Sequence, residues 1–178
     1  MIPIARSHWA AMIRADRASA FGWGLVVTQF VLLAVLISHT ISARRTAGLT
    51  HTVGLATAAV GVSVLGGASL QLGRDLRVHP APHASTALRT DGAYRLVRHP
   101  IYSGLLLFAA GIAIVNGTLR GSAVSCGLGL LLAVKAHFEE RLLARRFPEY
   151  AQYASRTPRF VPSFRGPSAV RLRDPRRG

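Results

Sequence analysis

Apolar residues in this chain gather in long runs that contain no Asp, Glu, Lys or Arg. Two such runs cover 26 residues (18–43) and 28 residues (46–73). A helix needs about 20 consecutive apolar residues to cross the hydrocarbon core of a bilayer, and a buried helix of a soluble protein needs fewer. The pattern therefore predicts membrane-spanning helices at about 21–41 and about 52–72.

A third apolar region, residues 101–138, is divided near its middle by Asn116-Gly117, a pair typical of turns. Each half is short for a full crossing, so we expect two helices that form a tight hairpin. The last helix is expected to continue through the charged residues 139–147 and to end at Pro148, since proline breaks a helix interior. The pattern predicts an all-α, multi-pass membrane protein with about four transmembrane helices, the last two being this short hairpin.

The second predicted span is rich in glycine. Gly54, Gly61, Gly66 and Gly67 all lie within it. Small residues allow helices in lipid to approach closely, so this helix is expected to be the most tightly packed. The alternative is that these glycines reflect composition alone.

Basic residues are divided unequally between the two sides of the predicted spans. Three lie before the first span, five lie in the loop 73–99 and eleven lie from Lys135 onward. The opposite side has only Arg44, Arg45 and Arg120. Cytoplasmic loops of membrane proteins carry the excess of Lys and Arg. Both termini, the middle loop and the C-terminal helices are therefore predicted to be cytoplasmic, at the inner membrane if the source is bacterial.

Composition excludes some other classes of protein. The net charge is +15, but a basic nucleic-acid module carries its Lys and Arg on a folded face without long apolar gaps, so no nucleic-acid partner is expected. The single Cys126 excludes an internal disulfide and a Cys-rich metal site. We expect residues 1–162 to form one membrane-embedded domain and residues 163–178 to form an Arg-rich flexible tail.

The first group of candidate residues lies where the middle loop meets the predicted hairpin. Pro100 suits the first turn of a helix, which places His99 near its N-cap. Unsatisfied N–H groups at a helix N-terminus can receive a carboxylate, and Tyr102 offers an aromatic ring and a hydroxyl nearby. The alternative is an ordinary helix start with an interfacial Tyr and an anchoring Arg98.

The second group lies where the last span meets the charged residues. Lys135 and Glu139 are four residues apart and share one helical face. Glutamates directly after an apolar span are costly to bury, so Glu139 and Glu140 are candidates for function if they face inward. The alternative is a solvated ion pair between Lys135 and Glu139. Farther along, Phe147, Tyr150 and Tyr153 could form a packing stripe or a wall for a flat ligand.

Two motifs resemble those of a known family. Residues 98–104, Arg-His-Pro-Ile-Tyr-Ser-Gly, resemble the RHPxYxG motif of the isoprenylcysteine carboxyl methyltransferase family and its phospholipid methyltransferase relatives. Residues 139–162 are similar to the C-terminal EExxL…F…Y…Y…PRFxP pattern of that family. The likeness covers about residues 88–162, and it implies methyl transfer from S-adenosyl-L-methionine to a lipophilic acceptor.

The resemblance also implies a site at the cytoplasmic face, enclosed by the middle loop, the hairpin and the C-terminal helices, with no metal. The residues that it assigns to the cofactor are Leu88, Tyr94, His99, Pro100, Ile101, Tyr102, Glu139 and Glu140. Lys135 stands where the family often has an Arg on the acceptor side of the site. Lysine has the same positive charge but lacks the planar guanidinium, which can bind a carboxylate with two N–H groups at once. Arg98 is the other candidate catalytic residue.

The acceptor is expected to enter from the bilayer, among membrane lipids. A prenylcysteine-like carboxylate, a lipid amine, and a small hydrophobic thiol or acid all suit such a site, and the oligomeric state stays open. One alternative is a nicotinamide-dependent reductase related to sterol reductases, which are much longer. Another is a non-catalytic membrane protein such as a transporter. A transport route normally has a charged or strongly polar residue near the middle of a span, and we expect none in these spans.

Overall fold

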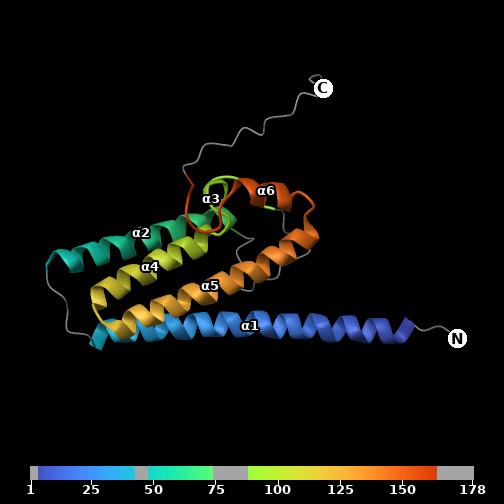
Figure 1. Ribbon diagram of the computed structural model, residues 1–178, viewed down its shortest axis with the longest axis horizontal. Coiled ribbons are helices and arrows are strands. Elements are labelled where there is room, and N and C mark those ends of the chain that lie inside the picture. The colour runs from blue at the N-terminus through green and yellow to red at the C-terminus, as the bar shows by residue number, and fades with distance from the viewer. Residues whose placement is uncertain (1–3, 43–47, 74–87, 164–178) are drawn as a thin grey trace, which may run out of the picture.

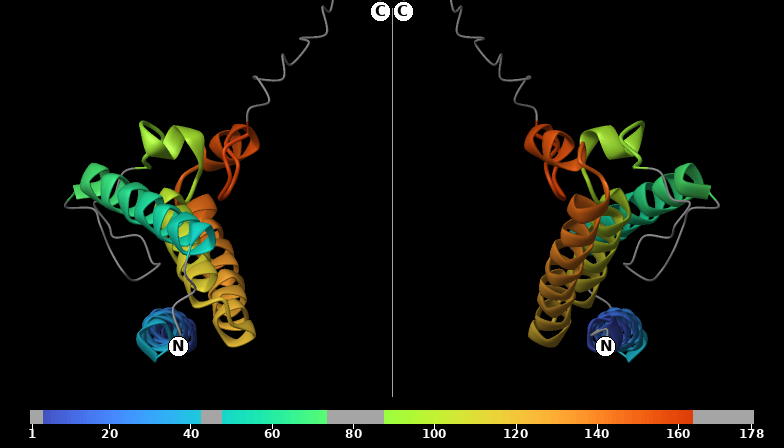
Figure 2. Two further views of the ribbon diagram at one scale, coloured as in Figure 1. Left: turned by 90° about the vertical axis from the view of Figure 1, so that its left-hand side faces the viewer. Right: turned by 90° about the vertical axis from the view of Figure 1, so that its right-hand side faces the viewer.

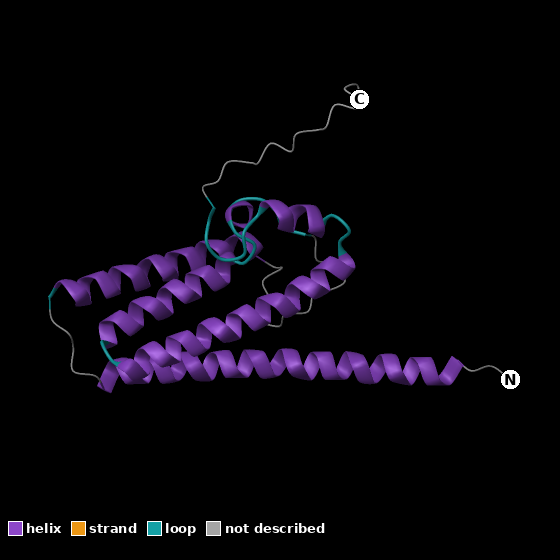
Figure 3. Ribbon diagram, in the orientation of Figure 1, coloured by secondary structure: helices purple, strands orange, loops and turns teal. Residues whose placement is uncertain are grey.

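The computed structural model describes residues 4–42, 48–73 and 88–163. All regular elements in these residues are helices, which confirms the predicted all-α class (Figures 1 and 3). They are α1 (Ile4–Ser42), α2 (Leu49–Leu72), α3 (Ala93–Leu96), α4 (Pro100–Asn116), α5 (Leu119–Arg146) and α6 (Tyr150–Arg156). The predicted tail lies outside the described residues except for Ser163, so the domain boundary at 162 stays a prediction.

Three of the helices are long and apolar enough to cross a membrane: the Ala20–His39 part of α1, α2, and α5. The fourth apolar helix, α4, has 17 residues and is shorter than a typical transmembrane helix. At about 1.5 Å per residue it measures roughly 26 Å, against a hydrocarbon core of about 30 Å. The multi-pass architecture is thus confirmed, with three described helices of full crossing length and a shorter α4 that forms the predicted hairpin with α5. α1 is also longer than predicted, since it begins at Ile4.

The hairpin between α4 and α5 follows the predicted turn. Gly117 has a φ of 59°, in the left-handed region that glycine adopts without a steric penalty. Thr118 then caps α5, its hydroxyl accepting a hydrogen bond from the Gly121 N–H at 3.1 Å. At the other end, α5 continues through the charged residues to Arg146 and stops before Pro148, as expected.

Glycine allows α2 and α4 to pack closely in antiparallel directions. Gly61 lies against Gly104, and Gly54 lies against Gly111. A Cβ on any of these four glycines would fall within 3.0 Å of a backbone atom of the other helix. The close-packing interpretation is therefore confirmed for two glycines of α2. It is wrong for Gly66 and Gly67, which face open space.

The core lies where α1, α4 and α5 meet. It consists of buried Leu36, Leu105, Ala109, Leu128 and Leu132. Helix α1 lies along α5, and α4 lies between α2 and this pair (Figure 2). Large apolar side chains on the outer faces, such as those of Phe30, Val60 and Leu130, stay exposed in the protein chain. This suits a surface that faces lipid.

Candidate active site

His99 lies at the N-cap of α4, with Pro100 in the first turn, as predicted. Its side chain makes no capping hydrogen bond. The imidazole turns instead toward α5, where its Nε2 lies 3.1 Å from Oε1 of Glu140. It also stacks on the ring of Tyr102, with the ring centroids 5.2 Å apart. The first motif thus contacts the end of the last span.

Glu140 is the centre of a cluster of positive groups. The guanidinium of Arg159 binds its carboxylate with both Nε (3.0 Å) and an NH2 group (2.5 Å). His99 approaches the same carboxylate, and Nε of Arg98 lies 3.4 Å from Oε1. Because the Glu140 side chain is only 10% exposed and already has these partners, its geometry suits a positioning role.

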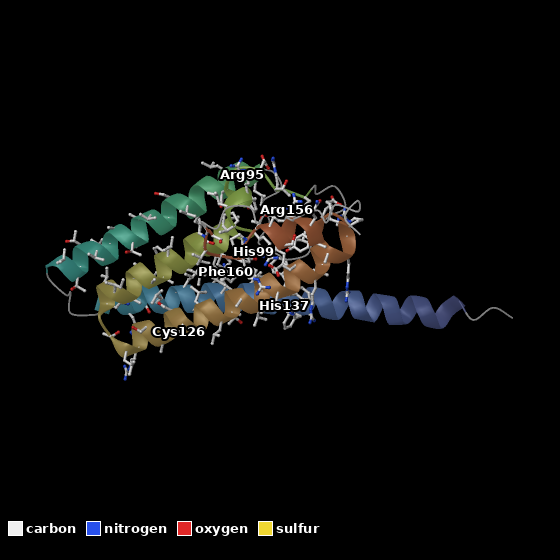
Figure 4. The ribbon with its side chains drawn as sticks, turned by 45° about the horizontal axis from the view of Figure 1, so that its top comes forward. Arg95, His99, Cys126, His137, Arg156 and Phe160 are labelled. Atoms are coloured by element: carbon white, nitrogen blue, oxygen red, sulfur yellow. The ribbon has the colours of Figure 1, made fainter. Side chains whose placement is uncertain are left out.

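Backbone hydrogen bonds join the same two segments. The N–H of Arg98 donates to the carbonyl of Pro158 (2.8 Å), and the N–H of His99 donates to the carbonyl of Arg159 (3.1 Å). The Ser103 hydroxyl donates to the carbonyl of Phe160 at 2.6 Å. His99 and Phe160 accordingly lie side by side, with ring centroids 5.9 Å apart (Figure 4). The two motifs, which residues 105–138 separate in sequence, form one structural unit.

Glu139 has a different environment from its neighbour. Its Oε2 accepts a hydrogen bond from the Tyr102 hydroxyl at 3.1 Å and lies 3.7 Å from Nδ1 of His99. The side chain is 29% exposed. A carboxylate that is partly accessible and has an aromatic ring beside it can receive a cationic group.

Lys135 is buried, with only 2% of its surface exposed. Its Nζ donates a hydrogen bond to Oε1 of Gln29 in α1 at 2.8 Å and lies 5.3 Å from the ring centroid of Tyr102. The alternative of a solvated ion pair with Glu139 is therefore wrong. So is the expectation that the spans have no strongly polar residue near their middle, because Gln29 lies in the middle of Ala20–His39. Gln29 is the only Gln or Asn in the uncharged run 18–43, and this was the signal that could have identified it.

Buried tyrosines complete the site. The hydroxyl of Tyr150 is buried and has no hydrogen-bond partner within the described part of the chain. Burial and, secondarily, the Glu140 carboxylate raise the pKa of Tyr150, so the group is a neutral donor at pH 7. Tyr94 is buried too, and its carbonyl accepts a hydrogen bond from the Tyr153 hydroxyl at 2.6 Å. Burial raises the pKa of Tyr153 to about 12.

For the remaining predicted residues, the structure gives the position in the fold and the degree of burial. Pro100 is buried and Ile101 half-buried in the first turn of α4, directly beside His99. Leu88 is half-buried and begins the described segment before α3. The contacts above bring together Arg98, His99, Tyr102, Lys135, Glu139 and Glu140. They do not include Leu88, Pro100 or Ile101, and the hydrogen bond of Tyr94 is with Tyr153.

Comparison with known proteins defines the class to which this fold and this cluster belong. Residues 49–150, more than half of the chain, match the family described as phospholipid methyltransferase. The chain belongs to this family and is an integral membrane protein, which confirms the resemblance drawn from the two motifs.

Three curated proteins show the range of its relatives. The chain is 33% identical over 166 residues to the cobalt-zinc-cadmium resistance protein CzcN of Cupriavidus metallidurans, covering 89% of this chain and 73% of that protein. It is 28% identical over 139 residues to the nickel-cobalt-cadmium resistance protein NccN of Alcaligenes xylosoxydans xylosoxydans, covering 77% and 62%. It is also 32% identical over 77 residues to protein-S-isoprenylcysteine O-methyltransferase B of Arabidopsis thaliana, covering 42% and 39%.

Proposed function

We propose that this protein transfers a methyl group from S-adenosyl-L-methionine to a lipophilic acceptor held in the bilayer. The family assignment supports methyl transfer at a membrane. The observation that carries the proposal is the pairing of the Tyr102 hydroxyl with the partly exposed Glu139 carboxylate, at the junction of the two motifs.

The residues at this junction suit the chemical groups of the cofactor. Glu139 would receive a cationic group, and the rings of Tyr102 and Tyr94 would supply aromatic faces for a sulfonium or for adenine. A buried hydroxyl without a partner costs about 1–3 kcal/mol, so the Tyr150 hydroxyl suits a hydrogen bond to a bound ligand. N–H groups of the first turn of α4, which begins at Pro100, would suit a carboxylate.

When bound, the sulfonium supplies a methyl group that is already activated for in-line displacement. The work left to the protein is to hold two reactants in line and to exclude water. His99, Arg98 and Arg159 assist by fixing Glu140, which ties the C-terminal segment to the start of α4. We place the acceptor beside Lys135, on the side of the site nearest α1.

The acceptor could be methylated on oxygen, nitrogen or sulfur. A prenylcysteine-like carboxylate matches the name of the plant relative, and a lipid amine matches the description of the family. The names of the two bacterial relatives refer to metal resistance and do not identify a methyl acceptor.

Calorimetry on the protein in lipid nanodiscs tests the proposed cofactor. S-adenosylhomocysteine, the product form of the cofactor, should bind, whereas a nicotinamide dinucleotide should not. Binding of the dinucleotide alone would favour the reductase alternative, and binding of neither would favour a non-catalytic membrane protein. Either result would refute the proposal.

We also propose that the site faces the cytoplasm, because basic residues divide 19 to 3 between the two sides. Single cysteines introduced as Ser122→Cys in α5 and Ser155→Cys in α6, in a Cys126→Ser background, probe this orientation. Both serines are exposed. An impermeant thiol reagent added to intact cells should label position 122 and leave position 155 unlabelled. The opposite pattern would reverse the orientation.

A further inference from the structure

Gln71, in the last turn of α2, binds the backbone on both sides of Gly92. Its Nε2 donates a hydrogen bond to the carbonyl of Asp91 at 2.9 Å, and its Oε1 accepts one from the N–H of Ala93 at 3.0 Å. We call these two hydrogen bonds the Gln71 bridge. They join residues 20 and 22 positions apart in sequence, and so they attach the start of α3 to the end of α2.

Gly92 has the conformation and the space that the Gln71 bridge requires. Its φ of 55° and ψ of −126° lie in a region of backbone conformation that glycine reaches without a steric penalty. A Cβ at this position would also overlap the side-chain amide of Gln71. Glycine therefore lets the carboxamide lie directly against the backbone, with one hydrogen bond on each side.

The end of α2 is a fixed point for this contact, because α2 packs closely against α4. Gly61 lies against Gly104, where a Cβ on either residue would meet the backbone of the other helix. The same α4 carries Tyr102 and, at its N-cap, His99 of the proposed cofactor site. Helix α3 has only four residues and is too short to be stable by itself, so its position depends on contacts such as the Gln71 bridge.

Tyr94, the second residue of α3, is the side chain that the bridge brings to the site. It is buried, with 9% of its surface exposed. Burial raises the pKa of its hydroxyl, and the Glu139 carboxylate raises it further, since a nearby negative charge disfavours ionisation. The carbonyl of Tyr94 accepts the hydrogen bond from Tyr153 of α6. Helix α3 is thus held at its start by α2 and at its middle by α6 (Figure 1).

We propose that Gln71 is a positioning residue for the cofactor site, because it holds α3 so that the ring of Tyr94 forms one wall of that site. Gln71 acts through Tyr94 and does not itself touch the cofactor. A wall that is already in place loses less conformational freedom when a ligand binds, so the ligand binds more tightly. That the ligand is S-adenosyl-L-methionine rests on the proposed function. Gln71 lies outside both sequence motifs.

Titration of S-adenosylhomocysteine into the protein in nanodiscs tests this role. Gln71→Leu has a side chain of similar size that cannot form either hydrogen bond, and it should bind the ligand about tenfold more weakly. Its melting temperature should fall by less than about 4 °C, because the bridge is partly exposed and water can replace it. Gln152→Leu, the same change at an exposed glutamine of α6, is the control and should bind like the parent. Parental affinity in Gln71→Leu would overturn the proposal.

A double-mutant cycle with Tyr94 separates positioning from general stabilisation. Tyr94→Leu removes the ring, so in that background the further change Gln71→Leu should alter the affinity by less than about twofold. An equal loss in both backgrounds would show that Gln71 does not act through Tyr94, and would overturn the proposal. Gly92→Ala, whose Cβ displaces the same amide, is a second variant that should also weaken binding, and parental affinity there would contradict the bridge.

Hydrogen exchange distinguishes a failure of this inference from a failure of the proposed function. Without ligand, a peptide that contains residues 88–97 should exchange at least about fivefold faster in Gln71→Leu than in the parent. Unchanged exchange, in a parent that binds S-adenosylhomocysteine, would overturn only the role of Gln71. Failure of the parent to bind, with faster exchange in the variant, would refute the proposed cofactor and leave Gln71 as the residue that positions α3.

Discussion

Glu139 and Glu140 are adjacent and chemically identical, yet the structure predicts opposite results when each is changed to Gln. Glu140 is 10% exposed and binds the guanidinium of Arg159 with two hydrogen bonds, with His99 and Arg98 beside it. Removing one partner of a fully buried ion pair costs about 3–5 kcal/mol. Because Arg159 is 35% exposed and water can partly compensate it, we expect Glu140→Gln to destabilise the protein by about 2–4 kcal/mol.

Glu139→Gln should affect ligand binding instead. The carboxylate is 29% exposed and accepts one hydrogen bond, from Tyr102, which a Gln carbonyl can also accept. Stability should therefore change by less than about 1 kcal/mol. The lost charge should cost about 1.5–3 kcal/mol of cofactor binding, or roughly ten- to a hundredfold in the affinity for S-adenosylhomocysteine.

Thermal unfolding followed by circular dichroism and calorimetric titration separate the two effects. At about 2–4 °C per kcal/mol for a chain of this size, Glu140→Gln should lower the melting temperature by roughly 4–16 °C. Glu149→Gln, at an exposed glutamate before α6, is the control and should change neither quantity. An unchanged affinity in Glu139→Gln would show that this residue is only a polar group at the end of a span. An unchanged melting temperature in Glu140→Gln would refute the positioning role.

Three further results are expected. Gly61→Ala should lower stability by about 1–3 kcal/mol, because its Cβ would meet the backbone of α4, whereas Gly67→Ala should be tolerated; equal melting temperatures would contradict the close packing. Tyr102→Ala should weaken S-adenosylhomocysteine binding more than Tyr102→Phe, which keeps the ring; parental affinity in both would remove the tyrosine from the site. Stability should fall as pH rises from about 10 to about 12, because the pKa of Tyr153 is raised to about 12 in the folded state and its ionisation removes the donor to Tyr94. Tyr153→Phe should lessen this loss of stability. An equally steep loss in that variant would show that another group causes it.

Much of the fold could be predicted from the sequence because it depends on neighbouring residues. Length and hydropathy predict where a span can lie, and the turn at Asn116-Gly117 and the helix start at Pro100 follow from local backbone preferences. The two motifs also predicted the family, because each lies within one short segment of the sequence and can be read without knowledge of the fold. The short apolar run before Asn116-Gly117 likewise predicts an α4 that is shorter than a full crossing, as the structure has it.

Tertiary structure decided what depends on which helix faces which. Consecutive residues on a helix point about 100° apart, and the packing of α4 against α5 directs Glu140 to the arginines and Glu139 to Tyr102. The same holds for Gln29, which meets Lys135 106 positions later in the chain. A lone Gln in an uncharged run specifies neither its partner nor its depth, because both depend on the packing of α1 along α5.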